Sequence, residues 1–389
     1  MEGFRTRSLH GSGDPKSTTE RPLSEPIHQV ADYVYESAEH YSEVINERRA
    51  GQVYGRYGNE TLDRLAETLA SLEKTESAWI FSSGMGAIHA VMMHLASAGD
   101  RLVAARTLYG GTYGLFTEGA ARAGIKVDFA DSRDPTNVEA ALQEPAKAVF
   151  IETIANPTFE LADIESISMI CQKRGVPLVV DNTVATPALF NPIDFGATLV
   201  VHSTSKYIGG HHDLMGGAVA GPADRMDEIR HLAIRYGTTA SALESWLALR
   251  GVATLGLRMQ CHSENALAVA LALEGARGVQ RVVYPGLESH PQHDLVRSML
   301  RGTGGMLAVD LGSRESAWAF MDALRIVRVG SSFGGVRSEC THPATTSHRQ
   351  FSRSDRAAAG IGEGLVRISV GIEDAEDLVA DVETALKVL

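Results

Sequence analysis

Five short apolar segments that alternate with helical ones constrain the fold more than any other feature of this sequence. They read SAWIFSS, DRLVAAR, KAVFIET, VPLVVDN and TLVVHS, and they lie between residues 77 and 203. The segments between them include 85–96 and 164–174, where apolar residues recur at helical spacing. Strands that alternate with helices are joined by right-handed crossovers into a mostly parallel sheet. We therefore expect an α/β fold whose ligand site lies beyond the carboxyl ends of the strands.

Three regions are expected along the 389 residues. Residues 1–55 are rich in turn formers and lack sustained periodicity, which predicts an extended arm. Residues 56–250 contain the alternating segments and are expected to form the ligand-binding domain. A long helical stretch over 240–277 leads into residues 251–389, where GGMLAVDL, VRVGSSF and LVRISVG predict strands of a smaller α+β domain.

Composition disfavours several classes of protein. The net charge of −12 argues against a nucleic-acid or anionic-membrane surface. No apolar run reaches the length of about 18 residues that a membrane helix needs, and the N-terminus lacks the apolar core of a signal peptide. The three cysteines are far apart, which argues against a disulfide framework or a structural zinc site. We therefore expect a cytoplasmic protein.

Lys206 is the most unusual of the seven lysines. The other six have polar or charged neighbours, whereas Lys206 follows the apolar run 197–201 and precedes the glycine-rich turn YIGGHHDLMGG. An ammonium group at the end of a buried strand is poorly solvated, so we expect its pKa to fall. The neutral amine is then a nucleophile that can form an imine with an aldehyde.

A second side chain at a strand end, Asp181, indicates which aldehyde this is. It ends the segment VPLVVD and precedes Lys206 in the chain. An aspartate in such a place is also typical of a helix N-cap. Together with the lysine it indicates pyridoxal phosphate, because a carboxylate that keeps the pyridine nitrogen protonated lets the ring accept electrons.

Other residues are candidates for contacts with this cofactor. The turn 82–86 leads from a strand into a helix, whose first N–H groups suit a phosphate, although any tight strand-to-helix connection has the same pattern. Ser203 and Ser205 flank the lysine and can add hydroxyl donors. Tyr109 lies among glycines and suits stacking on the ring, with plain packing as the alternative, and Asn156 suits the phenolic oxygen.

The motifs YGRYGNET, SSGMGA, LYGGTYG, ETIANP, VVDNT, STSKYIGGH, HPATTSH and LVRISVG resemble the Cys/Met-metabolism family of pyridoxal-phosphate enzymes, which act in trans-sulfuration. The resemblance extends from about residue 25 to the C-terminus. It implies a type I pyridoxal-phosphate transferase-like fold, a small amino-acid substrate and a homotetramer built as a dimer of dimers with shared active sites. It also implies that the N-terminal arm contacts the neighbouring subunit.

The resemblance implies a role for each matched residue. Lys206 and Tyr109 would be catalytic. The cofactor would be bound by Lys206, Asp181, Tyr109, Asn156, Gly84, Met85, Ser203 and Ser205, and by Tyr54 and Arg56 of the neighbouring subunit. The substrate would contact Arg367, Asn156 and Ser332, with Gly114 and Ser331 near its distal end.

Departures from the family pattern concern the distal end of the substrate. The cystathionine enzymes of the family carry arginine in place of Gly114 and glutamate in place of Ser331, so this chain lacks both charges. Methionine γ-lyases are neutral at both positions, although they often have cysteine in place of Gly111. Arg337 and Ala242 replace a glutamate and a proline that are common in the family, and the sequence offers no account of either.

The sequence therefore predicts γ-elimination on a methionine-like amino acid, which gives an α-keto acid, ammonia and a thiol. The alternative is γ-replacement on an activated homoserine, because both reactions use the same residues. A non-catalytic cofactor-binding protein is disfavoured, because storage of the cofactor needs no substrate clamp such as Arg367.

Two other patterns near Lys206 are weaker. The spacing from Ser203 to Lys206 fits a serine acyl-transferring enzyme, but the Lys-Thr-Gly element of that class is missing. The run 211–213, HHD, is poorly placed to converge on one ion, so no metal is expected.

Overall fold

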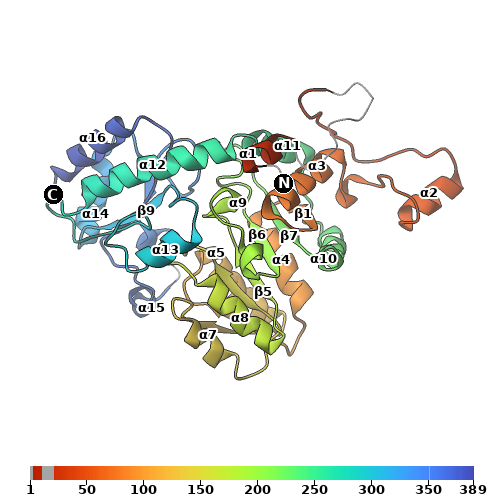
Figure 1. Cartoon of the computed structure of the whole chain (residues 1–389), viewed down its shortest axis with the longest axis horizontal. Coiled ribbons are helices and arrows are strands. Elements are labelled where there is room, and N and C mark those ends of the chain that lie inside the picture. Colours follow the sequence, from red (N-terminus) through yellow and green to blue (C-terminus); the bar gives the residue numbers. More distant parts are fainter. Residues whose placement is uncertain (1–2, 11–21, 350) are drawn as a thin grey trace.

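Two sheets organise the chain. The computed structural model describes residues 3–10, 22–349 and 351–389 (Figure 1). The larger sheet has seven strands in the order β1, β7, β6, β5, β4, β2, β3. These strands are β1 (Ser77–Phe81), β2 (Arg101–Ala105), β3 (Lys126–Ala130), β4 (Val149–Glu152), β5 (Leu178–Asp181), β6 (Leu199–His202) and β7 (Gly217–Gly221). Every neighbouring pair is parallel except the two that include β7, so the predicted α/β fold with a mostly parallel sheet is confirmed.

The five apolar segments of the sequence form β1, β2, β4, β5 and β6. Their residues are nearly all buried, as expected for strands in a parallel sheet covered by helices. The sequence analysis did not predict β3 or β7. β7 reads GAVAG, which has a low strand propensity, and it becomes a strand because it pairs with β1 on one side and β6 on the other.

Helices pack against this sheet. Asn59 caps α3 by accepting hydrogen bonds from the amides of Thr61 and Leu62, and the leucine face of α3 is buried in the core. Helices outside the C-terminal part are α1 (Phe4–His10), α2 (Ala38–Ile45), α3 (Glu60–Glu73), α4 (Gly84–Leu95), α5 (Gly110–Gly114), α6 (Ala120–Arg122), α7 (Pro135–Ala141), α8 (Ile164–Arg174), α9 (Thr186–Leu189) and α10 (Ala223–Tyr236). None of the helices in the described ranges combines the length and the apolarity that crossing a membrane requires.

The long helical stretch predicted over 240–277 is two helices. α11 (Ala242–Val252) ends before α12 (Leu255–Leu273) begins. The buried guanidinium of Arg258 donates a hydrogen bond to the carbonyl of Gly251 in α11 at 2.7 Å. Gly251 also lies so close to the chain at Gly209 that an added Cβ would be 2.3 Å from that carbonyl oxygen. The helix is interrupted at this point because the Gly251 backbone contacts Arg258 and Gly209. The hydrophobic periodicity of the sequence does not predict such contacts.

The second sheet belongs to the C-terminal part. It has five strands in the order β10, β11, β12, β9, β8. These are β8 (Arg281–Val283), β9 (Met306–Asp310), β10 (Arg328–Val329), β11 (Glu339–Thr341) and β12 (Leu365–Ser369), and the remaining helices are α13 (His293–Met299), α14 (Arg314–Ala323), α15 (Arg353–Ala358) and α16 (Ala375–Leu386). A separate apolar cluster packs α12, α14 and α16 against it. The domain boundary near residue 250 stays a prediction.

The segment that carries α2 is an arm that projects away from both sheets, whereas α1 packs against α3 and α12. Figure 1 shows α2 at the far end of this arm. Leu23 and Val34 on the arm are fully exposed, and Tyr41 and Tyr54 are about half exposed. Apolar side chains held away from the body are typical of a surface that another chain covers.

Candidate active site

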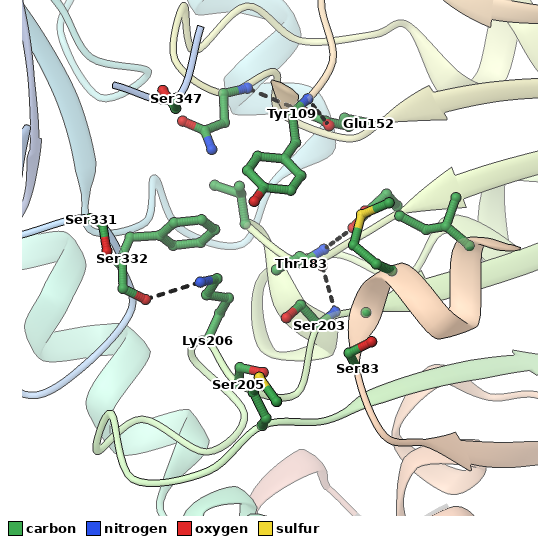
Figure 2. A pocket seen from close by; sticks show the side chains of 18 of the residues that line it. Ser83, Tyr109, Glu152, Thr183, Ser203, Ser205, Lys206, Ser331, Ser332 and Ser347 are labelled. Carbon is green, nitrogen blue, oxygen red and sulfur yellow. Dashed lines mark hydrogen bonds between the residues drawn. The ribbon is translucent and has the colours of Figure 1, made fainter. Parts of the chain in front are cut away.

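A cavity of about 580 Å³ lies at the carboxyl ends of β4, β5 and β6, between the two parts of the chain. This is the position expected for a ligand of a parallel sheet. Its wall contains eleven of the residues predicted from the sequence: Gly84, Met85, Tyr109, Asn156, Asp181, Ser203, Ser205, Lys206, Ser331, Ser332 and Arg367. Figure 2 shows Ser83 and Ser203 on one side, Ser331 and Ser332 on the other, and Lys206 projecting between them.

The Lys206 amine is held by the C-terminal part of the chain. Nζ donates a hydrogen bond to Ser332 Oγ at 2.9 Å and lies 5.1 Å from the centre of the Phe333 ring (Figure 2). Burial lowers the pKa of Lys206, and the nearby guanidinium of Arg367 lowers it further, while Glu339 opposes them. The Lys206 ammonium therefore gives up its proton more readily than that of an exposed lysine.

The first turn of α4 forms one end of the cavity. Ser83 Oγ accepts from the Gly86 amide at 3.0 Å, and Gly84 and Met85 precede that amide in the cavity wall. The first amides of a helix have no partner within the helix, so they can bind an anion. A Cβ at Gly84 would lie 2.8 Å from the Ser203 Cβ, so only glycine lets this turn approach Ser203 so closely.

Two buried carboxyl groups form the floor. Glu152 and Asp181 are opposite each other on β4 and β5. Asp181 accepts from the Thr183 amide at 3.0 Å, whereas Glu152 accepts from the amides of Tyr109 at 2.7 Å and Asn156 at 3.2 Å. Burial, together with the charge of Asp181, raises the pKa of Glu152 to about 8. Burial also raises the pKa of Asp181, whereas the hydrogen bonds from Thr183 and the charge of His202 lower it.

The Tyr109 ring lies across the mouth of the cavity and is 44% exposed. In Figure 2 its hydroxyl end points into the cavity, and the dashed line from its amide marks the bond to Glu152. A Cβ at Gly111 would approach the ring to 2.6 Å. A side chain at position 111 would therefore clash with the Tyr109 ring in this position.

Arg367 is a buried cation in the cavity wall. Nη2 donates to the Ser332 carbonyl and Nη1 contacts Asn156 Oδ1 at 3.4 Å, but Nε has no hydrogen-bond partner among the described residues. Burial lowers the pKa of Arg367 to about 10, with Glu339 opposing this, so the guanidinium stays charged at neutral pH. A buried guanidinium with a free donor fits a carboxylate, which can accept two parallel hydrogen bonds.

Comparison with known proteins identifies the family. The model of the Cys/Met metabolism PLP-dependent enzymes matches residues 5–387. The chain belongs to this family. It is 40% identical to O-succinylhomoserine sulfhydrylase of Pseudomonas aeruginosa, covering 100% of this chain and 97% of that protein. It is 37% identical to L-methionine gamma-lyase of Treponema denticola, covering 99% and 96%. The crystal structure of cystathionine gamma synthase from Xanthomonas oryzae pv. oryzae superposes with a TM-score of 0.94 at 37% identity, covering 100% of this chain and 98% of that one.

Several predictions are thereby confirmed. The resemblance is correct, the fold is that of the PLP-dependent transferases, and the protein is a PLP-dependent lyase or transferase of sulfur amino-acid metabolism. The cofactor is pyridoxal phosphate. When bound, it accepts electrons from the substrate carbon that carries the amine.

The cavity of this PLP enzyme fits the cofactor. Lys206 can bind its aldehyde, the first turn of α4 with Ser203 can hold its phosphate, and Asp181 can hold its ring nitrogen. The space at Gly84 supports this fit, because a Cβ at that position would clash with Ser203 and crowd the place proposed for the phosphate. These individual roles stay proposals.

Three residues predicted for the site lie outside the cavity wall. Tyr54 and Arg56 line a separate hollow of about 490 Å³ at the base of the arm, where Arg56 donates to the Ile234 carbonyl at 2.8 Å. Gly114 ends α5 and is in neither wall.

Ala242 is the first residue of α11, a position that accepts alanine as well as the proline common in the family. Nothing in the structure explains the exposed Arg337.

The sequence analysis missed three charged or titratable groups in the wall, namely Glu152, His212 and Arg349. Glu152 ends an apolar strand just as Asp181 does, so the same rule would have found it. Arg349 follows the motif HPATTSH, and only its place in the fold shows that it reaches the cavity. His212 has a positive φ of 58°, which is uncommon for a residue other than glycine.

Replacing Glu152 by glutamine is expected to make folding stability less dependent on pH. The pKa of Glu152 is raised from 4.5 to about 8 in the folded state. Between these values the folded chain binds a proton that the unfolded chain releases, so its stabilising contribution is full below the lower value and is lost as the pH rises through the higher one. Urea unfolding of the apoenzyme between about pH 4 and about pH 9 should show a steeper decline in the wild type than in Glu152→Gln. Parallel curves would contradict the assignment of the proton to Glu152.

Proposed function

We propose that this enzyme catalyses γ-replacement on a homoserine ester whose acyl group ends in a carboxylate, with a thiol or sulfide as the incoming nucleophile. The observation that carries the proposal is Arg349 in the wall of the cavity that also contains Lys206 and Arg367. One guanidinium suffices for the α-carboxylate of an amino acid. A second one suits a substrate with another acidic group.

This proposal reverses an argument from the sequence. The absence of arginine at Gly114 and of glutamate at Ser331 favoured a neutral substrate such as methionine. Gly114, however, is not part of the cavity wall, whereas Arg349 is. The cavity wall therefore has a cation that the family pattern did not indicate, and we assign it to the distal end of the substrate.

The charges of the wall also bear on cystathionine, whose distal end carries an ammonium as well as a carboxylate. Among the described residues of the wall, the carboxyl groups are Glu152 and Asp181. Both accept hydrogen bonds from backbone amides at the floor. Apart from these two, the described part of the chain offers no carboxylate in the wall to a distal ammonium group, which supports an acyl ester over cystathionine.

The proposed reaction uses residues whose positions suit its proton transfers. The Lys206 amine, with its lowered pKa, removes one proton from Cα and then one from Cβ, and it returns a proton to each carbon after the exchange at Cγ. The Cγ–O bond breaks and the acyl group leaves as a carboxylate, which needs no proton at neutral pH because carboxyl pKa values are near 4. A Cγ–S bond then forms, and the proton of the thiol balances the charge of the departing carboxylate.

The relatives support both γ-replacement and γ-elimination. A sulfhydrylase named for O-succinylhomoserine is 40% identical to this chain, and an L-methionine gamma-lyase is 37% identical. γ-Elimination of a methionine-like amino acid is accordingly the second candidate function.

Replacing Arg349 by glutamine is expected to lower kcat/KM for O-succinyl-L-homoserine about 10-fold, because an exposed arginine loses one charged hydrogen bond to the distal carboxylate. The value for O-acetyl-L-homoserine, which has no distal carboxylate, should stay unchanged. Steady-state kinetics with both esters and a thiol would measure the ratio. Arg349→Lys should restore part of it.

Arg353→Gln, on the exposed face of α15, is the matched control and should leave both esters unaffected. Equal losses for the two esters would contradict a distal role for Arg349. Faster turnover of L-methionine than of either ester would instead favour γ-elimination.

The homotetramer and the cytoplasmic location predicted from the sequence also stay proposals. The hollow lined by Tyr54 and Arg56, together with the exposed apolar side chains of the arm, supports a neighbouring subunit at this place. Sedimentation velocity of the holoenzyme would overturn the tetramer if it showed a monomer.

A further inference from the structure

Glu339 is a carboxylate beside the cavity that neither the family pattern nor the reaction above uses. It is the first residue of β11, and its side chain is 13% exposed. Oε2 accepts from the Ser332 amide at 3.3 Å. Oε1 lies 3.7 Å from His212 Nε2 and has no hydrogen-bond partner among the described residues. A largely buried carboxylate with one unpaired oxygen lowers the free energy of unfolding, which indicates a functional role.

Ser332 connects Glu339 to both cations of the site. Its hydroxyl accepts from Lys206 Nζ (Figure 2), and its carbonyl accepts from Arg367 Nη2. The amide of the same residue is the group that Glu339 binds. The three polar groups of Ser332 therefore bind three charged side chains, and the orientation of one peptide segment determines where Lys206 and Arg367 are held.

Two glycines make room for this arrangement. A Cβ at Gly330 would lie 2.1 Å from Glu339 Oε2, and a Cβ at Gly335 would lie 1.9 Å from His212 Nε2. Any other residue at either position would displace Glu339 or His212. Both glycines belong to the loop that carries Ser332, so the loop is shaped around these two side chains.

The charge of Glu339 also acts on both cations. It opposes the lowering of the pKa of Lys206 and is the first of the charges that oppose the lowering of the pKa of Arg367. Among the described residues, His212, Lys206 and Arg367 lie near the Glu339 carboxylate, Cys340 follows it in the chain, and Arg328 on β10 is its register partner. Of these, Lys206 and Arg367 are the ones that the proposed reaction uses.

We propose that Glu339 is a positioning residue, which holds the Ser332 segment against Lys206 and Arg367 through the Ser332 amide and acts as the resident counter-charge of both cations. His212 packs against its second oxygen and keeps the carboxylate in place. The role does not depend on the identity of the γ-substituent, because it concerns the lysine and the clamp for the α-carboxylate.

Two variants separate the hydrogen bond from the charge. Glu339→Gln keeps an oxygen for the Ser332 amide but removes the charge, so the pH titration of the cofactor absorbance in the holoenzyme should shift to lower pH. Glu339→Leu removes both, so the Ser332 segment is released and kcat should fall about 10-fold or more, since small displacements in an active site can lower rates up to about 100-fold.

A double-mutant cycle tests whether Glu339 acts through Ser332. Ser332→Ala removes the hydroxyl that binds Lys206 but keeps the backbone amide and carbonyl. In that background Glu339→Leu should therefore lower kcat by a smaller factor than in the wild type, because the lysine contact is already lost. Losses that multiply would overturn the proposal. An unshifted absorbance titration in Glu339→Gln would overturn the counter-charge.

Glu373 is the matched control. It also accepts from a serine amide, that of Ser338 at 2.7 Å, and a Cβ at Gly371 would lie 2.3 Å from its Oε2. It does not contact Lys206 or Arg367 in the described structure. Glu373→Gln should leave the titration and the kinetics unchanged. A shift as large as that of Glu339→Gln would show that any buried carboxylate of this region has the effect and would contradict a specific role for Glu339.

Discussion

Replacing Lys206 by alanine is expected to abolish turnover and the visible absorbance of the holoenzyme. Its amine has a lowered pKa and lies in the cavity between the first turn of α4 and the loop of Ser332. In the proposed reaction it binds the cofactor and also moves the protons, so two functions disappear with one group. We expect kcat to fall on the order of 10⁴-fold, the upper range for the loss of a general base. Absorbance spectra and single-turnover kinetics of the purified protein would measure both effects.

Two variants serve as controls for this result. Lys206→Arg keeps the positive charge but cannot form an imine, so it should be as inactive as Lys206→Ala. Lys173→Ala removes an exposed lysine from the last turn of α8 and should leave both readouts unchanged. If Lys206→Ala kept its turnover, another amine would have to bind the cofactor.

Replacing Arg367 by leucine is expected to lower kcat/KM about 100-fold or more, mainly through a higher KM for the amino acid. The guanidinium is buried, and its Nε has no partner in the described part of the chain. Removing one member of a buried, hydrogen-bonded ion pair commonly has an effect of this size. Arg367→Lys keeps the charge but loses the planar fork, so its kcat/KM should lie between those of the wild type and the leucine variant. Steady-state kinetics with any accepted amino acid would measure the change.

Arg258 offers a matched comparison for a buried arginine. Burial lowers the pKa of Arg258 to about 10, as it does for Arg367. Its donors, however, bind the carbonyls of Tyr207, Ile208 and Gly251. Arg258→Leu should therefore lower the melting temperature more than Arg367→Leu does, because three buried carbonyls lose their partner. A KM effect as large as that of Arg367→Leu would contradict the assignment of Arg367 as the carboxylate clamp.

The strand ends could be predicted because each is a local pattern. Lys206 and Asp181 follow short apolar runs, and the carboxyl ends of parallel strands meet at one edge of the sheet. Glu152 obeys the same rule and could have been found with it. The arm of residues 1–55 stays a prediction; α1 and α2 were not predicted, and α1 packs against α3 and α12.

The substrate pocket could not be predicted in the same way. Gly114 matches a family position near the distal end of the substrate, yet it ends α5 outside the cavity wall. Arg349 belongs to that wall although it lies far along the chain in the C-terminal part. A match to a family motif therefore does not show where a residue lies in space. The distal pocket is built from loops, and the path of a loop depends on how it packs against the rest of the protein.

The sequence by itself determined the α/β fold, the family and the cofactor of this protein, because strand periodicity, the strand-end lysine and the ordered motifs are all properties of short segments. Only the tertiary structure decided which charges surround the lysine. The charges of Glu339 and Arg367 act on it from the C-terminal part of the chain, and Arg349 from the same part lines the cavity. Glu152 accepts from the Tyr109 amide. These groups meet because two separate sheets pack on either side of one cavity, and the strength of each charge there depends on burial that no local pattern reports.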